Sequence, residues 1–80
     1  MDGRILIVED DEEIAALVEL YLKDEGFTVN KFGSAVEALE HLNGSEAELA
    51  LLDVLLPDMD GFALCRRIRE EHSFPIIMLF

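Results

Sequence analysis

Acidic residues follow two apolar segments of this sequence, and their side chains suit metal binding or nucleophilic attack. Glu9 and Asp10 come directly after the apolar run Ile5 to Val8, and Asp53 comes directly after the run Leu49 to Leu52. If these runs are neighbouring strands of a parallel sheet, their carboxyl ends meet at one edge and the three carboxylates converge. Like charges at such short range raise one another's pKa, so a divalent cation is the simplest way to offset their repulsion.

Magnesium fits such a cluster, because it prefers hard oxygen ligands in an octahedron and usually keeps several water molecules. With the metal neutralising charge, a carboxylate such as that of Asp53 can attack phosphorus in line and form an aspartyl phosphate. The three carboxylates therefore predict a magnesium-dependent phosphoacceptor site.

A second explanation is open for the acids that follow the first apolar run. Asp11, Glu12 and Glu13 lie where acidic residues favourably meet the N-terminal dipole of a helix, and for these three we prefer that explanation. Glu9, Asp10 and Asp53 stand at the ends of two different strands, and no single capping role explains all three. For these acids a metal site therefore remains open beside the capping explanation.

The elements that must position these acids alternate along the chain. Short apolar segments predict strands at 4–8, 27–32, 49–52 and 75–80, and helical spacing predicts helices at about 11–25, from Ser34 to about Asn43, and from Phe62 to before Pro75. Alternation of this kind implies a doubly wound α/β fold, with a parallel sheet, right-handed crossovers and helices on both faces. The strand order 2-1-3-4 makes the two acid-bearing strands neighbours.

Several side chains are expected at particular places on the helices. Ile14, Leu17, Val18 and Tyr21 recur at helical spacing and predict the apolar stripe of the first helix. Asp60 is expected to cap the third helix. Gly26 is expected just beyond the end of the first helix, where a left-handed conformation is common.

Composition limits the classes of partner and compartment. The 80 residues carry 18 acidic and six basic side chains, a formal charge of -12, which argues against direct binding to nucleic acid or to anionic lipid. The longest apolar runs have four or five residues, far short of the ~20 that span a bilayer. The single cysteine, Cys65, cannot form an intrachain disulfide, which favours a cytoplasmic location.

Three segments carry a resemblance to a known family. The sequence reads ILIVEDD at 5–11, LLDVLLPDMDG at 51–61 and PIIML at 75–79, and these segments resemble the receiver domains of two-component response regulators, most closely those of the OmpR/PhoB type. The resemblance covers the whole chain and implies a flavodoxin-like fold.

The resemblance also implies roles for individual residues. Asp53 would accept a phosphoryl group from the phosphohistidine of a sensor histidine kinase, and Mg²⁺ would be held by Glu9, Asp10, Asp53 and the backbone carbonyl of Leu55. The chain would be a signalling phosphoprotein rather than an enzyme. It would normally control a DNA-binding output domain involved in transcription.

Two family features are not found in the sequence. The family has Thr or Ser after the leucine of its fourth strand, where this chain has Phe80, and a Lys at the end of a fifth strand, which lies beyond these residues. We therefore interpret residues 1–80 as one receiver domain that lacks the segment after its fourth strand. Because that strand would have an unpaired, apolar edge, we expect the chain to self-associate.

Two other functions are weighed against phosphate acceptance. An aspartate-nucleophile phosphohydrolase typically repeats an acid two residues after the nucleophile, where this chain has Leu55. A receiver-like module could instead act through dimerisation or protein binding without phosphorylation, and the missing hydroxyl and lysine make that function the main alternative for this chain.

Overall fold

The computed structural model describes residues 3–79, in which strands and helices alternate. The strands are β1 (Arg4–Val8), β2 (Thr28–Phe32), β3 (Leu49–Asp53) and β4 (Ile76–Leu79), and the helices are α1 (Glu12–Asp24), α2 (Ala35–Leu42) and α3 (Gly61–Arg69). The predicted bounds differ by at most one residue, except that α3 ends at Arg69, several residues before the limit predicted at Pro75. The fourth strand begins after Pro75, which has no N–H to donate but accepts from Ala50 at 3.0 Å. Phe80, expected at its end, lies outside the described residues.

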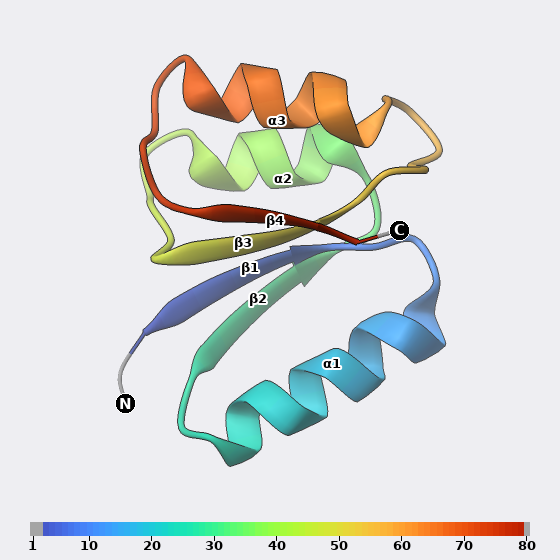
Figure 1. Ribbon diagram of the computed structural model, residues 1–80, viewed down its shortest axis with the longest axis vertical. Coiled ribbons are helices and arrows are strands. Elements are labelled where there is room, and N and C mark those ends of the chain that lie inside the picture. The colour runs from blue at the N-terminus through green and yellow to red at the C-terminus, as the bar shows by residue number, and fades with distance from the viewer. Residues whose placement is uncertain (1–2, 80) are drawn as a thin grey trace.

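The four strands are parallel and lie in the order β2-β1-β3-β4, which confirms the predicted topology. Figure 1 shows α1 on one face of the sheet and α2 and α3 together on the other. Residues Ile5 to Val8 of β1 are at most 2% exposed. Burial on both faces of the sheet explains why this strand is apolar without alternation.

The sheet separates two hydrophobic clusters. The larger lies on the side of α2 and α3, and its fully buried members include Leu6, Leu52, Leu64 and Ile68. The third helix contributes Leu64 and Ile68 to this cluster. The smaller cluster lies under α1.

Of the apolar stripe predicted for α1, only Val18 packs against the sheet. Ile14, Leu17 and Tyr21 are 46%, 54% and 67% exposed. The residues that pack on the smaller cluster lie mostly one position further along, and they are Ala15, Val18 and Leu22. The small Ala15 side chain, 4% exposed, allows the helix to lie close to β1. Because apolar residues cover more than one side of this helix, their spacing could not decide which side faces the sheet.

The predicted helix ends are confirmed. Asp11 caps α1, and its Oδ1 accepts from the N–H groups of Glu13 at 3.0 Å and Ile14 at 3.2 Å. Asp60 caps α3, accepting from Phe62 N–H at 2.7 Å. Gly26 follows α1 with φ of 92°, a conformation that glycine adopts without strain.

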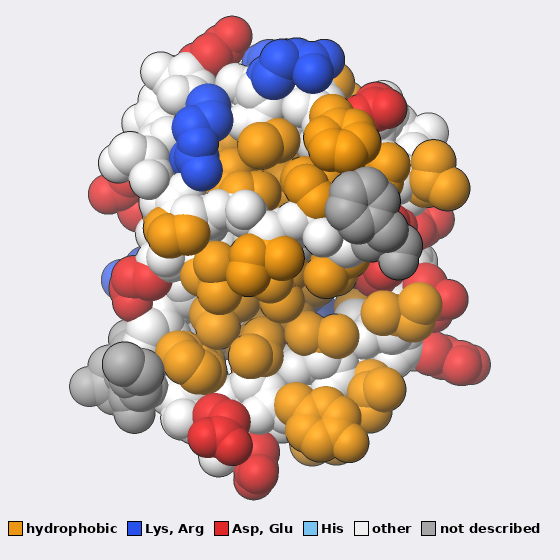
Figure 2. Space-filling model, in the orientation of Figure 1, with side chains coloured by type: hydrophobic (Ala, Val, Ile, Leu, Met, Phe, Trp, Pro, Cys, Tyr) orange, Lys and Arg blue, Asp and Glu red, His pale blue; other side chains and the backbone are white. Residues whose placement is uncertain are grey.

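The edge of the sheet that β4 forms presents apolar surface. Among the described residues β4 is an edge strand, hydrogen-bonded only to β3, and its Ile77 is 50% exposed. Figure 2 shows hydrophobic side chains gathered over the middle of this side, between the paired helices and α1. On α1 itself Leu20 is also 64% exposed.

Candidate functional site

The site lies where β1 and β3 end side by side. Val8 is paired with Leu52, so the residues that follow them, Glu9 and Asp53, leave the same edge of the sheet together. Carboxylate oxygens of Glu9, Asp10 and Asp53 lie within 4.8 Å of one another. The structure therefore brings together the three acids that the sequence singled out.

The acidic residues that follow β1 have two different roles: Glu9 and Asp10 belong to the cluster, and Asp11 caps α1. Glu9 is only 8% exposed, its backbone N–H donates to Phe32 O at 3.0 Å, and its carboxylate accepts from Asp11 N–H at 3.2 Å. Asp10 is exposed and also belongs to the cluster. Asp11 points instead to the first turn of α1. The backbone turn after β1 thus explains why neighbouring acids differ in role.

Asp53 lies at the carboxyl end of an inner strand and is half-buried. Its Oδ1 accepts from the N–H of Leu55 at 3.2 Å, so the side chain and the start of the loop after β3 hold each other in place. The side chain of Leu55 is 77% exposed. The expected use of the Leu55 carbonyl as a metal ligand remains a prediction.

The electrostatics of the cluster show the cost of placing three acids together. Burial raises the pKa of Glu9 from its ordinary 4.5 to about 7, and the adjacent carboxylate of Asp53 adds to the rise. The hydrogen bond from the N–H of Asp11 acts in the opposite direction. A buried acid that keeps its proton near neutral pH indicates that the site lacks enough positive charge of its own.

The donor set fits a small, hard cation. In a magnesium octahedron with oxygens at about 2.0–2.1 Å from the ion, adjacent ligand oxygens lie roughly 2.9 Å apart and opposite ones roughly 4 Å apart. The three carboxylate oxygens already lie within 4.8 Å, so small side-chain rotations would bring them onto one ion. One cation would also offset the negative charge of Asp53, which adds to the effect of burial in raising the pKa of Glu9.

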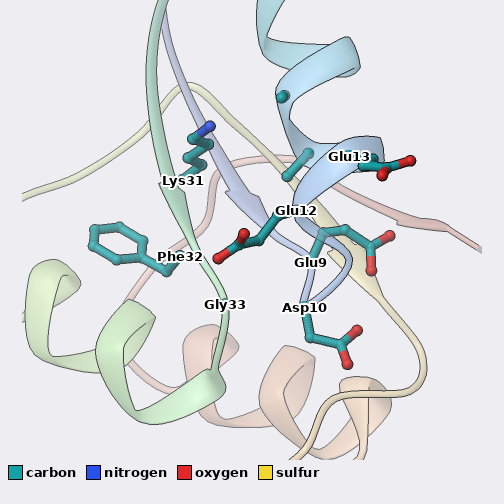
Figure 3. Close-up of a pocket in the computed structure, with 9 residues that line it drawn as sticks. Glu9, Asp10, Glu12, Glu13, Lys31, Phe32 and Gly33 are labelled. Atoms are coloured by element: carbon teal, nitrogen blue, oxygen red, sulfur yellow. The ribbon is translucent and has the colours of Figure 1, made fainter.

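A pocket of about 590 Å³ opens beside the cluster, between the start of α1 and the end of β2. Glu9 and Asp10 form part of its wall (Figure 3), and Lys31 and Phe32 contribute from β2. The amine of Lys31 lies 3.0 Å from the carboxylate of Glu19. The pocket therefore gives access to Glu9 and Asp10, whereas Asp53 is not among the residues that line it.

One residue near the site was missed by the sequence reasoning. Asp58, in the loop between β3 and α3, accepts from the N–H groups of Ala35 and Val36 at the start of α2, both at 2.9 Å. These hydrogen bonds lower the pKa of Asp58. The contacts join segments more than 20 residues apart, so local spacing carried no signal for them.

The raised pKa of Glu9 predicts how stability depends on pH. The folded protein binds more protons than the unfolded chain between pH 4.5 and about 7. The contribution of Glu9 is therefore fully present below pH 4.5 and is lost as the pH rises through about 7. At about 1.4 kcal/mol per unit, we expect the free energy of unfolding to fall by on the order of 2 to 3 kcal/mol across this window.

Urea unfolding at a series of pH values, without divalent cations, measures this fall. Glu9→Gln cannot ionise, so it should flatten the profile between pH 4.5 and 7. The pKa values of Asp58 and Glu19 are lowered on folding, so these two groups make the free energy of unfolding rise with pH. Their effect falls below pH 4.5 and does not overlap the window of Glu9. A fall as steep in Glu9→Gln as in the parent would contradict the assignment to Glu9.

Comparisons with known proteins agree with this geometry. Residues 5–79 match the family described as the response regulator receiver domain. The chain is 54% identical over 79 residues to the regulatory protein VanR of Enterococcus faecium, covering 99% of this chain and 34% of that protein. It is 44% identical over 75 residues to the transcriptional regulatory protein CseB of Streptomyces coelicolor, covering 94% of this chain and 32% of that protein.

A solved structure supports the fold. The BeF3-activated N-terminal receiver domain of Klebsiella pneumoniae RstA superposes with a TM-score of 0.89 at 34% identity, covering 95% of this chain and 65% of that one. VanR and CseB are longer proteins, and this chain spans about a third of the length of each. Within residues 3–79, no helix is long and apolar enough to cross a membrane. On the match over residues 5–79, this chain belongs to the family of response regulator receiver domains, and its relatives are of the OmpR/PhoB type.

Proposed function

We propose that Asp53 accepts a phosphoryl group from the phosphohistidine of a sensor histidine kinase. The observation that carries this proposal is the convergence of Glu9, Asp10 and Asp53 at the ends of adjacent strands. Asp53 is the most suitable acceptor of the three, because it is half-buried at the end of an inner strand and its Oδ1 is oriented by Leu55 N–H. Glu9 is only 8% exposed and is therefore less accessible to a phosphodonor.

In the proposed reaction a carboxylate oxygen of Asp53 attacks phosphorus in line. A P–O bond forms, the P–N bond of phosphohistidine breaks, and its electron pair returns to the imidazole nitrogen. Glu9, Asp10, Asp53 and the carbonyl of Leu55 would hold Mg²⁺, which neutralises charge on the phosphoryl oxygens. The chain's own part is to position the acceptor and to keep the cluster open to the partner's histidine.

The output of the signal belongs to the same proposal. The relatives are named as regulatory and transcriptional regulatory proteins, and this chain matches about a third of each. We therefore expect the receiver to act in the cytoplasm on a DNA-binding output domain. It would not contact nucleic acid itself, because its formal charge is -12. No catalytic turnover is proposed beyond transfer to its own aspartate.

A phosphodonor experiment tests the acceptor directly. We expect incubation with acetyl phosphate and Mg²⁺ to add one phosphoryl group, detected by intact mass, and Asp53→Asn to reduce labelling to about a tenth or less. Asp60→Asn is a matched control, because asparagine also caps helices and Asp60 lies outside the cluster. Equal labelling of Asp53→Asn and the parent would overturn the proposal.

A second candidate function is self-association that does not need phosphate. The observations that favour it are the unpaired edge of β4 and the exposed Ile77 among the described residues, together with the exposed stripe of α1. The two functions are compatible, since this surface lies on α1 and β4 rather than at the acidic cluster.

A further inference from the structure

The loop between β3 and α3 (residues 54–60) begins directly after the proposed acceptor. Its two ends are fixed to each other, because the N–H of Gly61 donates to the carbonyl of Val54 at 2.8 Å and Leu55 forms an isolated antiparallel bridge with Asp60. Leu55 N–H in turn donates to Asp53. The position of this loop therefore decides where Leu55 lies relative to the acidic cluster.

The middle of the loop is tied to another element by Asp58. Its two carboxylate oxygens accept separately from Ala35 N–H and Val36 N–H, each at 2.9 Å. Hydrogen bonds to an ionised acceptor are stronger than neutral ones, and the N-terminal dipole of α2 favours negative charge at this point. The lowered pKa of Asp58 agrees with a carboxylate that is held in its charged form.

Helix α2 also has a local N-cap, Ser34, in addition to its contacts with Asp58. Ser34 Oγ accepts from Glu37 N–H at 3.3 Å, so Ser34 and Asp58 together serve the first three N–H groups of the helix. Two caps of different origin allow the effects on α2 and on the loop to be separated. Removing Ser34 weakens the helix start and leaves the loop tethered, whereas removing Asp58 affects both.

We infer that Asp58 is a positioning residue for the acidic cluster, and that by anchoring the 54–60 loop to α2 it places Leu55 and Asp53 for magnesium. The inference rests on the proposed function. Leu56 and Met59 of the same loop pack against the larger hydrophobic cluster and hold its inner side. Asp58 supplies the polar anchor on the outer side, and its two-oxygen contact fixes direction as well as distance.

A magnesium titration followed by NMR tests the inference without measuring phosphorylation. The parent, Asp58→Ala, Asp58→Asn and the control Ser34→Ala are titrated with MgCl₂, and the amide signals of Asp53 and Leu55 report binding. We expect Asp58→Ala to raise the Kd for Mg²⁺ about tenfold and Ser34→Ala to change it less than about twofold. Asp58→Asn keeps one acceptor oxygen and should fall between them.

Hydrogen exchange in the absence of magnesium gives an independent measurement. We expect the amide of Leu55 to exchange about tenfold faster in Asp58→Ala than in Ser34→Ala, because only the first variant releases the loop. Circular dichroism establishes that each variant is folded.

The two proposals fail in different ways. Equal Kd values and equal Leu55 exchange in Asp58→Ala and Ser34→Ala would show that Asp58 is a helix cap and would overturn the inference alone. A folded parent that binds no Mg²⁺ would overturn the proposed function and the inference that depends on it.

Discussion

Replacing Gly61 with alanine is expected to destabilise the protein by about 3 kcal/mol and to displace the proposed phosphoacceptor. A Cβ at this position would lie 2.1 Å from the carbonyl oxygen of Asp53 and 2.8 Å from Cα of Val54. Both are backbone atoms, so no side-chain rotation relieves the overlap. Helix propensity favours alanine by at most about 1 kcal/mol, which is too little to reverse the sign.

Thermal unfolding measures the effect, with Gly33→Ala as the matched control. A Cβ on Gly33 would meet no atom within 4 Å. For a domain of this size, 3 kcal/mol corresponds to a fall in Tm on the order of 15 °C. Gly33→Ala should change Tm by no more than about 2 °C. Similar Tm values for the two variants would show that the start of α3 is free to move away from Asp53.

The 80-residue chain in isolation is expected to form dimers or larger species at micromolar concentration. Among the described residues β4 is hydrogen-bonded on one side only, and its exposed Ile77 has no charged neighbour within the strand. Unpaired apolar edges are sites of strand pairing between chains. Symmetric dimers are the commonest closed form. Size-exclusion chromatography with light scattering over about a hundredfold dilution gives the mass.

A charged substitution on the edge of β4 distinguishes self-association by strand pairing from self-association through another surface. Ile77→Lys places a cation at the middle of β4 and should shift the mass toward the 9.0 kDa monomer. Val36→Lys is the control, because Val36 is similarly exposed at 53% but lies on α2. A folded parent that remains at 9.0 kDa throughout the dilution would contradict self-association.

The placement of the three acids could be predicted from the sequence because it depends on strand order and on little else. Glu9 and Asp53 each follow an apolar run, and parallel neighbours end at the same edge. The caps of α1 and α3 were also predictable. Asp11 and Asp60 accept hydrogen bonds from N–H groups two and three residues away, so sequence spacing contains the whole interaction.

Features that depend on packing between elements were not predictable. The face of α1 that meets the sheet is decided by how closely Ala15 can approach β1, and the sequence offers a second apolar stripe one residue away. The contact between Asp58 and α2 requires two loops to meet at one edge of the sheet. Neither feature produces a local pattern in the sequence, so both could be recognised only in the three-dimensional structure.

The two layers of the core are unequal, and this gives the molecule an expected order of opening. Among the described residues the cluster under α1 has three buried members, Ile5, Ile7 and Ala15, whereas the cluster under α2 and α3 has ten. The α1 layer should therefore undock first in native-state fluctuations. Asp10 lies at the hinge of that movement, so undocking would draw it away from Asp53. A cation shared by these acids would act as a latch on α1, and exchange at the remote end of the helix would slow when the cluster is occupied.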